Sequence, residues 1–275
     1  MNSFLKAGAL ALTIGLSVAG SASAAGVKSL FLGGDSVGQI DAARGDIIGS
    51  DARFDQLGSA SASLYGGSPT LSYLQQFDSV LVWTNSVPDT TALSNVLGDY
   101  VDAGGRVVIS TFWGQEVEAL HMGGGGGKLN SEGYNPLTNG VTDAYNLHTL
   151  GAFNAASPLM AGVNSLTSPY YNGDYAPGLD AGATLVASWN DGRPLVAING
   201  AQNVIAVTLF PNVATYAHAS GDYRQLFGNA LAFSGAPTIS AAPEPASWAM
   251  MVIGLGGLGG TLRVSRRRQM ALATA

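Results

Sequence analysis

The chain has 275 residues, of which 11% are charged, 38 are glycine and none is cysteine. Without cysteine it can form no disulfide, thiolate nucleophile or cysteine-ligated metal site. Between Ala25 and Ala242 there are 7 basic and 17 acidic residues, a net charge of −10. Such a core repels the phosphates of nucleic acid, so we expect no nucleic-acid partner.

Residues 1–24 have the pattern of a secretory signal peptide. Lys6 supplies the positive charge, an apolar run extends from Ala7 to Ala19, and residues 21–24 end in a small-x-small pattern. Signal peptidase cleaves after such a pattern because its pockets admit only small side chains. We therefore expect export by the general secretion machinery and cleavage after Ala24. As an uncleaved anchor, the apolar run would be short for a bilayer.

The first part of the core begins with a short apolar run. Val27 to Leu32 predicts a strand, and Gly33-Gly34-Asp35 predicts the turn that ends it. Residues 35–52 are polar and are interpreted as a solvated loop. The next expected elements are a weak strand over 54–63, a short helix over 71–76 and a buried strand over 78–84.

The strongest helix signal begins at Pro88-Asp89-Thr90 and ends at Gly104-Gly105. Its apolar residues recur at helical spacing and form one stripe, consisting of Leu93, Val96, Leu97, Tyr100 and Val101. A buried strand is expected next, over 106–111. Strand, helix and strand in this order predict a βαβ unit, and hence a parallel sheet with a right-handed crossover.

The second half of the core carries weaker signals. Residues 122–135 include five consecutive glycines, 123–127, before Lys128, and are interpreted as a mobile loop rather than a phosphate-binding motif. The elements expected after it are strands over 184–189, 194–199 and 203–210, the last two joined as a hairpin across 200–202, and a closing helix over 222–233. Residues 25–234 thus predict one α/β domain. It would be a flavodoxin-like three-layer sandwich with a mostly parallel sheet and a C-terminal antiparallel extension.

The C-terminus contains three elements in a fixed order after a small, polar linker at 235–242. Pro243-Glu244-Pro245 is followed by an uncharged apolar run over 246–262, and then by the basic residues Arg263, Arg266, Arg267 and Arg268. As a helix, the 17 residues of the apolar run span roughly 25 Å. Arginine snorkelling can make up part of the difference from a hydrocarbon core of about 30 Å. We expect one transmembrane helix, with the arginines and the tail 269–275 in the cytoplasm.

This order resembles the PEP-CTERM sorting signal. The resemblance implies that an exosortase in the inner membrane recognises the tail, cuts near the PEP motif and releases the protein to the cell surface or outside. It also implies a Gram-negative host that makes exopolysaccharide, and a role in its biofilm matrix. The seven residues after the arginines, 269–275, make this tail longer than is usual. The alternative is a plain single-pass anchor.

The core shows a second resemblance. The segments FDSVLVWTN, LGDYVDAGGRVVIST, WNDGRPLVAI and VIAVTLFPN are similar to the class I glutamine amidotransferase-like superfamily, nearest to its trehalose-utilisation-like branch. That resemblance implies a cysteine on the turn after strand 107–111, activated by histidine and glutamate. Here the turn reads Ser110-Thr111-Phe112-Trp113-Gly114, and no His-x-Glu pair occurs. The glutaminase triad is therefore absent.

Other catalytic and metal-binding chemistry has little support in the residues. A substitute nucleophile would need Ser110 or Thr111 beside one of the histidines, His121, His148 or His218. The turn lacks the GxSxG frame, so local backbone hydrogen bonding is favoured. Four aspartates, Asp35, Asp41, Asp46 and Asp51, suggest calcium, but their spacing matches no EF-hand. No catalytic residue, metal site or cofactor is predicted.

Any ligand of such a fold is expected in the crevice at the carboxyl ends of the strands. The residues expected to line it are Gly33, Gly34, Asp35, Thr84, Asn85, Thr111, Phe112 and Trp113. An aromatic ring beside hydroxyl and amide groups would suit a sugar. The sequence thus predicts an exported surface protein, sorted by an exosortase, whose core is a non-catalytic binding module. The alternative is a secreted hydrolase or carbohydrate-active enzyme that uses the same crevice.

Overall fold

The computed structural model describes residues 26–235, apart from 88, 115–125, 139–140, 144 and 176–177. The proposed signal peptide, the PEP motif, the apolar run and the arginine cluster all lie outside these residues. Within the described part of the chain, no helix is long and apolar enough to cross a membrane.

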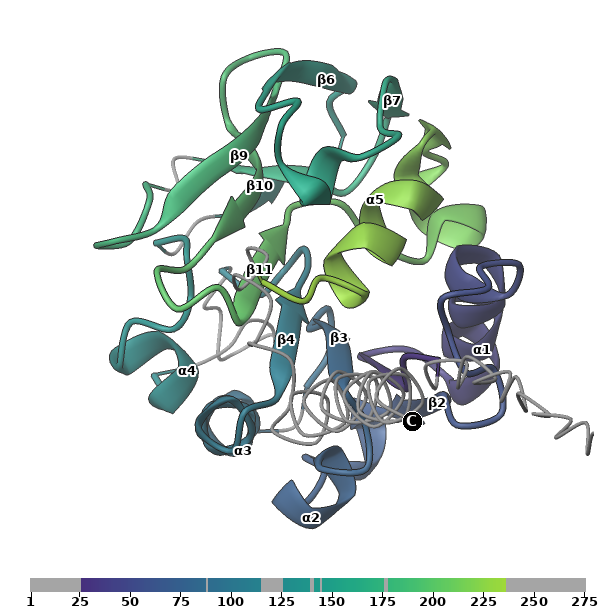
Figure 1. Ribbon diagram of the computed structural model, residues 1–275, viewed down its shortest axis with the longest axis vertical. Coiled ribbons are helices and arrows are strands. Elements are labelled where there is room, and N and C mark those ends of the chain that lie inside the picture. The colour runs from purple at the N-terminus through teal and green to yellow at the C-terminus, as the bar shows by residue number, and fades with distance from the viewer. Residues whose placement is uncertain are drawn as a thin grey trace, which may run out of the picture.

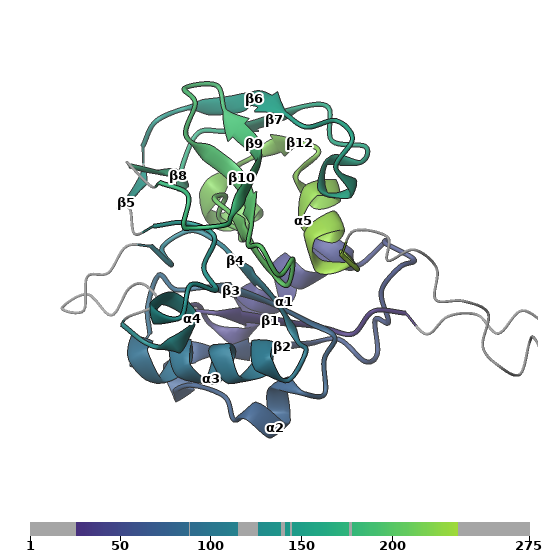
Figure 2. The ribbon, with the colours of Figure 1, turned by 60° about the vertical axis from the view of Figure 1, so that its left-hand side comes forward.

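One half of the main sheet is parallel (Figures 1 and 2). In spatial order its strands are β2 (Ala60–Ser63), β1 (Ser29–Gly33), β3 (Ser79–Trp83), β4 (Arg106–Ile109) and β11 (Val204–Val207). Each pairs in parallel with the next. The parallel strands therefore have the order 2-1-3-4-5 of flavodoxin-like folds, whose topological switch point lies between β1 and β3.

The other half of the sheet is antiparallel. Its strands, continuing from β11, are β10 (Pro194–Ile198), β9 (Thr184–Trp189), β6 (His148–Phe153), β7 (Leu166–Ser168) and β12 (Ser220–Gly221). The predicted hairpin is confirmed, since β10 and β11 pair antiparallel with Ala197 opposite Ala206. The sheet is mixed rather than mostly parallel, because β6, β7 and β12 enlarge the antiparallel part.

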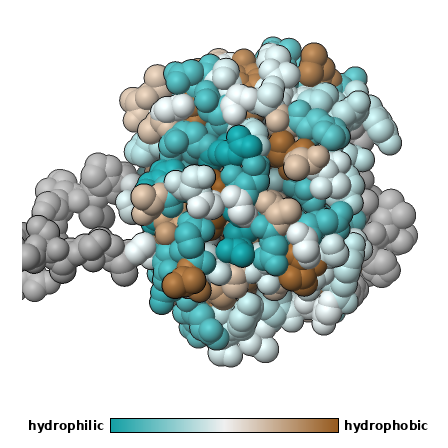
Figure 3. All heavy atoms as spheres, turned by 90° about the vertical axis from the view of Figure 1, so that its right-hand side faces the viewer, coloured by the Kyte–Doolittle hydropathy of each residue, from teal (hydrophilic) through white to brown (hydrophobic). Residues whose placement is uncertain are grey.

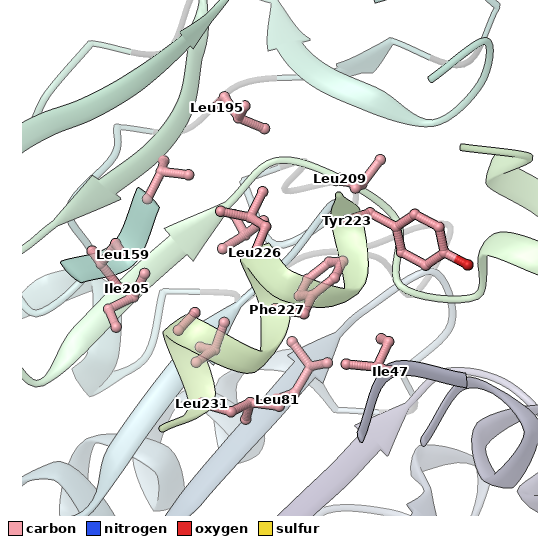
Figure 4. Close-up of a cluster of buried hydrophobic side chains, with 14 of the residues drawn as sticks. Ile47, Leu81, Leu159, Leu195, Ile205, Leu209, Tyr223, Leu226, Phe227 and Leu231 are labelled. Carbon is pink, nitrogen blue, oxygen red and sulfur yellow. The ribbon is translucent and has the colours of Figure 1, made fainter. Parts of the chain in front are cut away.

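Helices cover both faces of the parallel strands. They are α1 (Val37–Ile48) and α5 (Tyr223–Leu231) on one face, and α2 (Leu71–Leu74), α3 (Thr90–Asp102) and α4 (Lys128–Ser131) on the other. Neighbouring strand residues point to opposite faces. Phe31 therefore belongs to the α1–α5 core and Leu30 to the α2–α3 core. Figure 4 shows Leu226, Phe227 and Leu231 of α5 beside Leu81 and Ile205 of the sheet.

The interpretation of residues 35–52 as a solvated loop is wrong, because α1 occupies most of the segment. Its buried residues are Ile40, Ala43, Ile47 and Ile48, at helical spacing. The side chain of Gln39 accepts a 3.2 Å hydrogen bond from the Ser36 backbone at the helix start. The exposed residues between them made the segment resemble a loop, but packing against the sheet and α5 decides its structure.

Three other expectations need correction. The strand expected over 54–63 is limited to β2, and Phe54 forms only an isolated bridge with Val27. The loop expected over 122–135 contains the one-turn helix α4. A small separate sheet of β5 (Val141–Asp143) and β8 (Asn172–Tyr175) was not predicted.

The outer surface of the α1 side is mostly hydrophilic (Figure 3). Hydrophobic residues appear on this face singly or in small groups, which is ordinary for a folded domain in water. This face therefore presents no broad apolar patch.

Candidate functional site

The site begins at the turn after β1, where the carboxylate of Asp35 is 2% exposed. Oδ2 accepts a 2.8 Å hydrogen bond from Trp83 Nε1, and Oδ1 accepts a 3.0 Å bond from Asn85 Nδ2. Both donors are neutral, and no ion pair among the described residues includes Asp35. The turn thus holds a buried carboxylate whose charge is not balanced by a cation.

Glycine at two consecutive positions lets this arrangement form. Gly33 lies directly opposite Trp83 in the β1–β3 pair, and a Cβ there would overlap the indole ring. A Cβ on Gly34 would lie 2.5 Å from Asn85 Oδ1 and from the Ser86 backbone. The indole can therefore lie across β1 to reach Asp35, and the loop after β3 can approach the loop after β1.

Phe112, on the turn after β4, has an unusual backbone conformation, with φ of 71°. Tyr171, just before β8, has φ of 51°. Left-handed backbone in bulky residues costs on the order of 1–3 kcal/mol each and is concentrated at functional sites. Both rings face the same pocket, so the strain coincides with the site.

The pocket has a volume of about 250 Å³ and is lined by Asn85, Phe112, Tyr171, Phe210 and Tyr216. The Phe210 ring lies 5.6 Å from Phe112, 5.7 Å from Tyr171 and 5.6 Å from Tyr216, measured between ring centroids. These separations are normal for interacting aromatic rings. Four rings therefore meet around one small cavity at the carboxyl ends of the parallel strands.

The edge of the pocket carries tyrosine hydroxyls. Gln39 Nε2 of α1 donates a 2.9 Å hydrogen bond to Tyr216 Oη, which fixes that ring against the rest of the site. The pKa of Tyr65 is raised by its partial burial and, further, by the nearby Asp35 and Tyr216. Because Tyr65 is 58% exposed, the electrostatic field of Asp35 extends to residues at the surface.

Of the predicted crevice residues, the structure brings Asp35, Asn85 and Phe112 together. Thr84 and Thr111 are fully buried beneath the turns, and their hydroxyls have no hydrogen-bond partner in the described chain. Trp113 does not reach the pocket, because it packs in the α2–α3 core and donates a 2.9 Å bond to Asn130 Oδ1. Its predicted place in the crevice is therefore wrong.

Three pocket residues do not appear among the predicted crevice residues. Phe210 follows the carboxyl end of β11, and recognising β11 as a parallel strand would have indicated it. Tyr171 comes from the segment before β8, and Tyr216 from the π-helical turn Val213–Ala217. No sequence signal marks these two, because irregular backbone places them.

The structure does not assemble a serine or threonine triad from the described residues. Ser110 Oγ donates to the Leu209 carbonyl, and Thr111 is buried. His148 lies on β6, four strands from β4, a separation of about 19 Å at the usual strand spacing. The His218 ring packs against Tyr170, and His121 lies outside the described residues.

The four aspartates considered for calcium do not converge. Asp41 pairs with Arg44, Asp46 with Arg224 and Asp51 with Arg53, whereas Asp35 is buried beside Trp83. No group of three or more potential metal ligands occurs among the residues that the structure describes.

A larger cavity, of about 510 Å³, lies between the end of α1 and α5. Its walls carry the pairs Arg53–Asp51 and Arg224–Asp46, with N–O distances of 2.6 Å in each. Because these charges already neutralise one another, the cavity offers no free charged group. The smaller aromatic pocket is the better candidate.

No known family model and no curated protein matches the chain. Among solved structures, a protein described as ThuA-like from Bacteroides uniformis is similar, with a TM-score of 0.51 and 12% identity over 80% of this chain and 97% of that one. A GMP synthase protein from Thermoplasma acidophilum has a TM-score of 0.48 and 12% identity, over 74% of this chain and 92% of that one. A glutamine amidotransferase from Thermotoga maritima has a TM-score of 0.43 and 9% identity, over 66% and 74%.

These likenesses concern the fold alone, since the identities are so low. The core is an α/β domain with a glutamine amidotransferase-like fold, as the sequence resemblance implied. Of the three structures, the ThuA-like protein has a TM-score above 0.5, and this chain covers almost its whole length. The two structures below a TM-score of 0.5 are too distant to add to this.

Proposed function

We propose that this chain is an exported surface protein whose core is a non-catalytic binding module. The observation that carries the proposal for the core is the position of Phe112. The resemblance implies a cysteine nucleophile on the turn after β4, and here a phenylalanine occupies that turn with a left-handed backbone. An aromatic ring in that position can contact a ligand, but it cannot act as a nucleophile or transfer a proton.

Delivery to the surface is proposed from the two ends of the chain. The general secretion machinery exports it, signal peptidase removes residues 1–24, and the apolar run 246–262 halts it in the inner membrane. An exosortase then cuts near Pro243-Glu244-Pro245. The released protein resides at the cell surface or in the extracellular matrix of a Gram-negative, biofilm-forming host, where exopolysaccharide would surround it.

Mass spectrometry of the full-length protein expressed in an exosortase-containing host tests this delivery. The surface fraction is expected to contain a mature C-terminus near Pro243–Pro245. Replacing all three motif residues with alanine is expected to keep the uncut chain in the membrane fraction. Pro237→Ala, a proline change in the linker, is the matched control and should leave processing intact. Intact peptides beyond Arg268 in the surface fraction would overturn the proposal.

A further inference from the structure

We propose that the aromatic pocket binds a small organic cation of the alkylammonium type. The inference rests on the proposed function of the core as a binding module, and it assigns the chemical class of the ligand. Three features of the described residues carry it: the rings of the pocket, the uncompensated Asp35 carboxylate, and the absence of basic residues from the lining.

The first feature is the concentration of aromatic rings. Four of the five lining residues, Phe112, Tyr171, Phe210 and Tyr216, are aromatic. The face of an aromatic ring is the negative part of its quadrupole, so a cation placed against it is attracted. Sites that recognise quaternary ammonium groups commonly use several such rings. Apolar methyl groups around the charged nitrogen also suit a pocket that is largely hydrocarbon.

The second feature is the negative charge directly behind the pocket wall. Asn85 lines the pocket and donates its 3.0 Å hydrogen bond to Asp35 Oδ1 on the far side. A buried carboxylate with neutral partners is costly unless a positive charge approaches. Because the surroundings are of low polarity, its field is weakly screened across this short distance. A bound cation would supply the missing opposite charge.

The third feature is the sign of the surroundings. The lining residues include no lysine, arginine or histidine. The whole segment between Ala25 and Ala242 has a net charge of −10, from 7 basic and 17 acidic residues. An anionic ligand would therefore meet repulsion, whereas a cation would be attracted before contact.

The test compares three probes by isothermal titration of the purified full chain. Choline carries the trimethylammonium charge, 3,3-dimethylbutanol has the same shape without the charge, and tetramethylammonium retains the charge alone. Choline and tetramethylammonium are expected to bind at least tenfold more tightly than 3,3-dimethylbutanol. Equal binding of choline and its neutral analogue would overturn the inference, as would failure of both cations to bind.

Asp35→Asn removes the buried charge with little change in shape and should weaken choline binding at least tenfold. Asp180→Asn, which removes the same charge on a residue outside the pocket lining, is the matched control. Should the Asp35 variant fail to fold, the comparison of charged and neutral probes on the unaltered chain still decides the matter. Binding of neutral monosaccharides without binding of either cation would overturn the cation but leave the binding module standing. Loss of surface delivery is read separately, from the mature C-terminus.

Discussion

Trp83 Nε1 and Asp35 Oδ2 lie 2.8 Å apart, and their hydrogen bond joins the carboxyl ends of β3 and β1 at the topological switch point. The bond spans two adjacent parallel strands, because the indole crosses over Gly33. Asn85 adds a second bond to the same carboxylate. The position and charge of the pocket wall therefore depend on the contact of one tryptophan with one glycine.

Gly33→Ala is expected to destabilise the protein by roughly 1–3 kcal/mol, because the new methyl group would overlap the Trp83 indole in a packed core. Gly45→Ala is the matched control. Gly45 lies within α1 with open space where a Cβ would stand, so alanine there should stabilise by about 0.5–1 kcal/mol. Urea unfolding followed by tryptophan fluorescence measures both. Equal stability of the two variants would contradict the proposed contact.

The Asp51–Arg53 pair predicts a specific loss of stability in acid. Hydrogen bonds from Arg53, despite partial burial, lower the pKa of Asp51 below its usual value. A carboxyl whose pKa is lower in the folded state stabilises the fold above its unfolded pKa of about 3.9. That contribution is lost as the pH falls through the lower, folded pKa.

A double-mutant cycle of Asp51→Asn and Arg53→Gln measures this contribution. The expected coupling is about 0.5–1 kcal/mol at pH 6, a small value because the Arg53 side chain is 40% exposed and solvent screens the pair. The coupling should decline below about pH 4 and vanish once Asp51 is protonated. A coupling that persists unchanged at pH 2 would show that the pair does not act through charge.

Much of the fold follows from apolar periodicity together with turn residues. α3 has a continuous apolar stripe and a Gly104-Gly105 stop, and the predicted strands β1, β3 and β4 are short apolar runs buried on both faces. By contrast, β6 reads HTLGAF and is only partly buried, so no pattern marks it. Its place is decided by pairing with β9 and β7.

The site was only partly predictable for a related reason. Asp35, Asn85 and Phe112 follow parallel strands directly, and the carboxyl ends of parallel strands meet at one edge of a sheet. Tyr216 reaches the pocket through a π-helical turn, and Tyr171 through a left-handed backbone. Neither conformation follows from residue type, since tertiary contacts hold both in place. One such contact is the 3.1 Å hydrogen bond from Phe210 N to the Tyr171 carbonyl.

The central claim is that the strand-end pocket binds a ligand without transforming it. Proton NMR of choline, and separately of neutral oligosaccharides, incubated with stoichiometric full-length protein tests this most directly. The account predicts broadened choline resonances, restored sharpness with Asp35→Asn, and unchanged chemical shifts and intensities for every compound after prolonged incubation. New resonances from a cleaved oligosaccharide, formed by the unaltered chain and not by a Phe112→Ala variant, would contradict it.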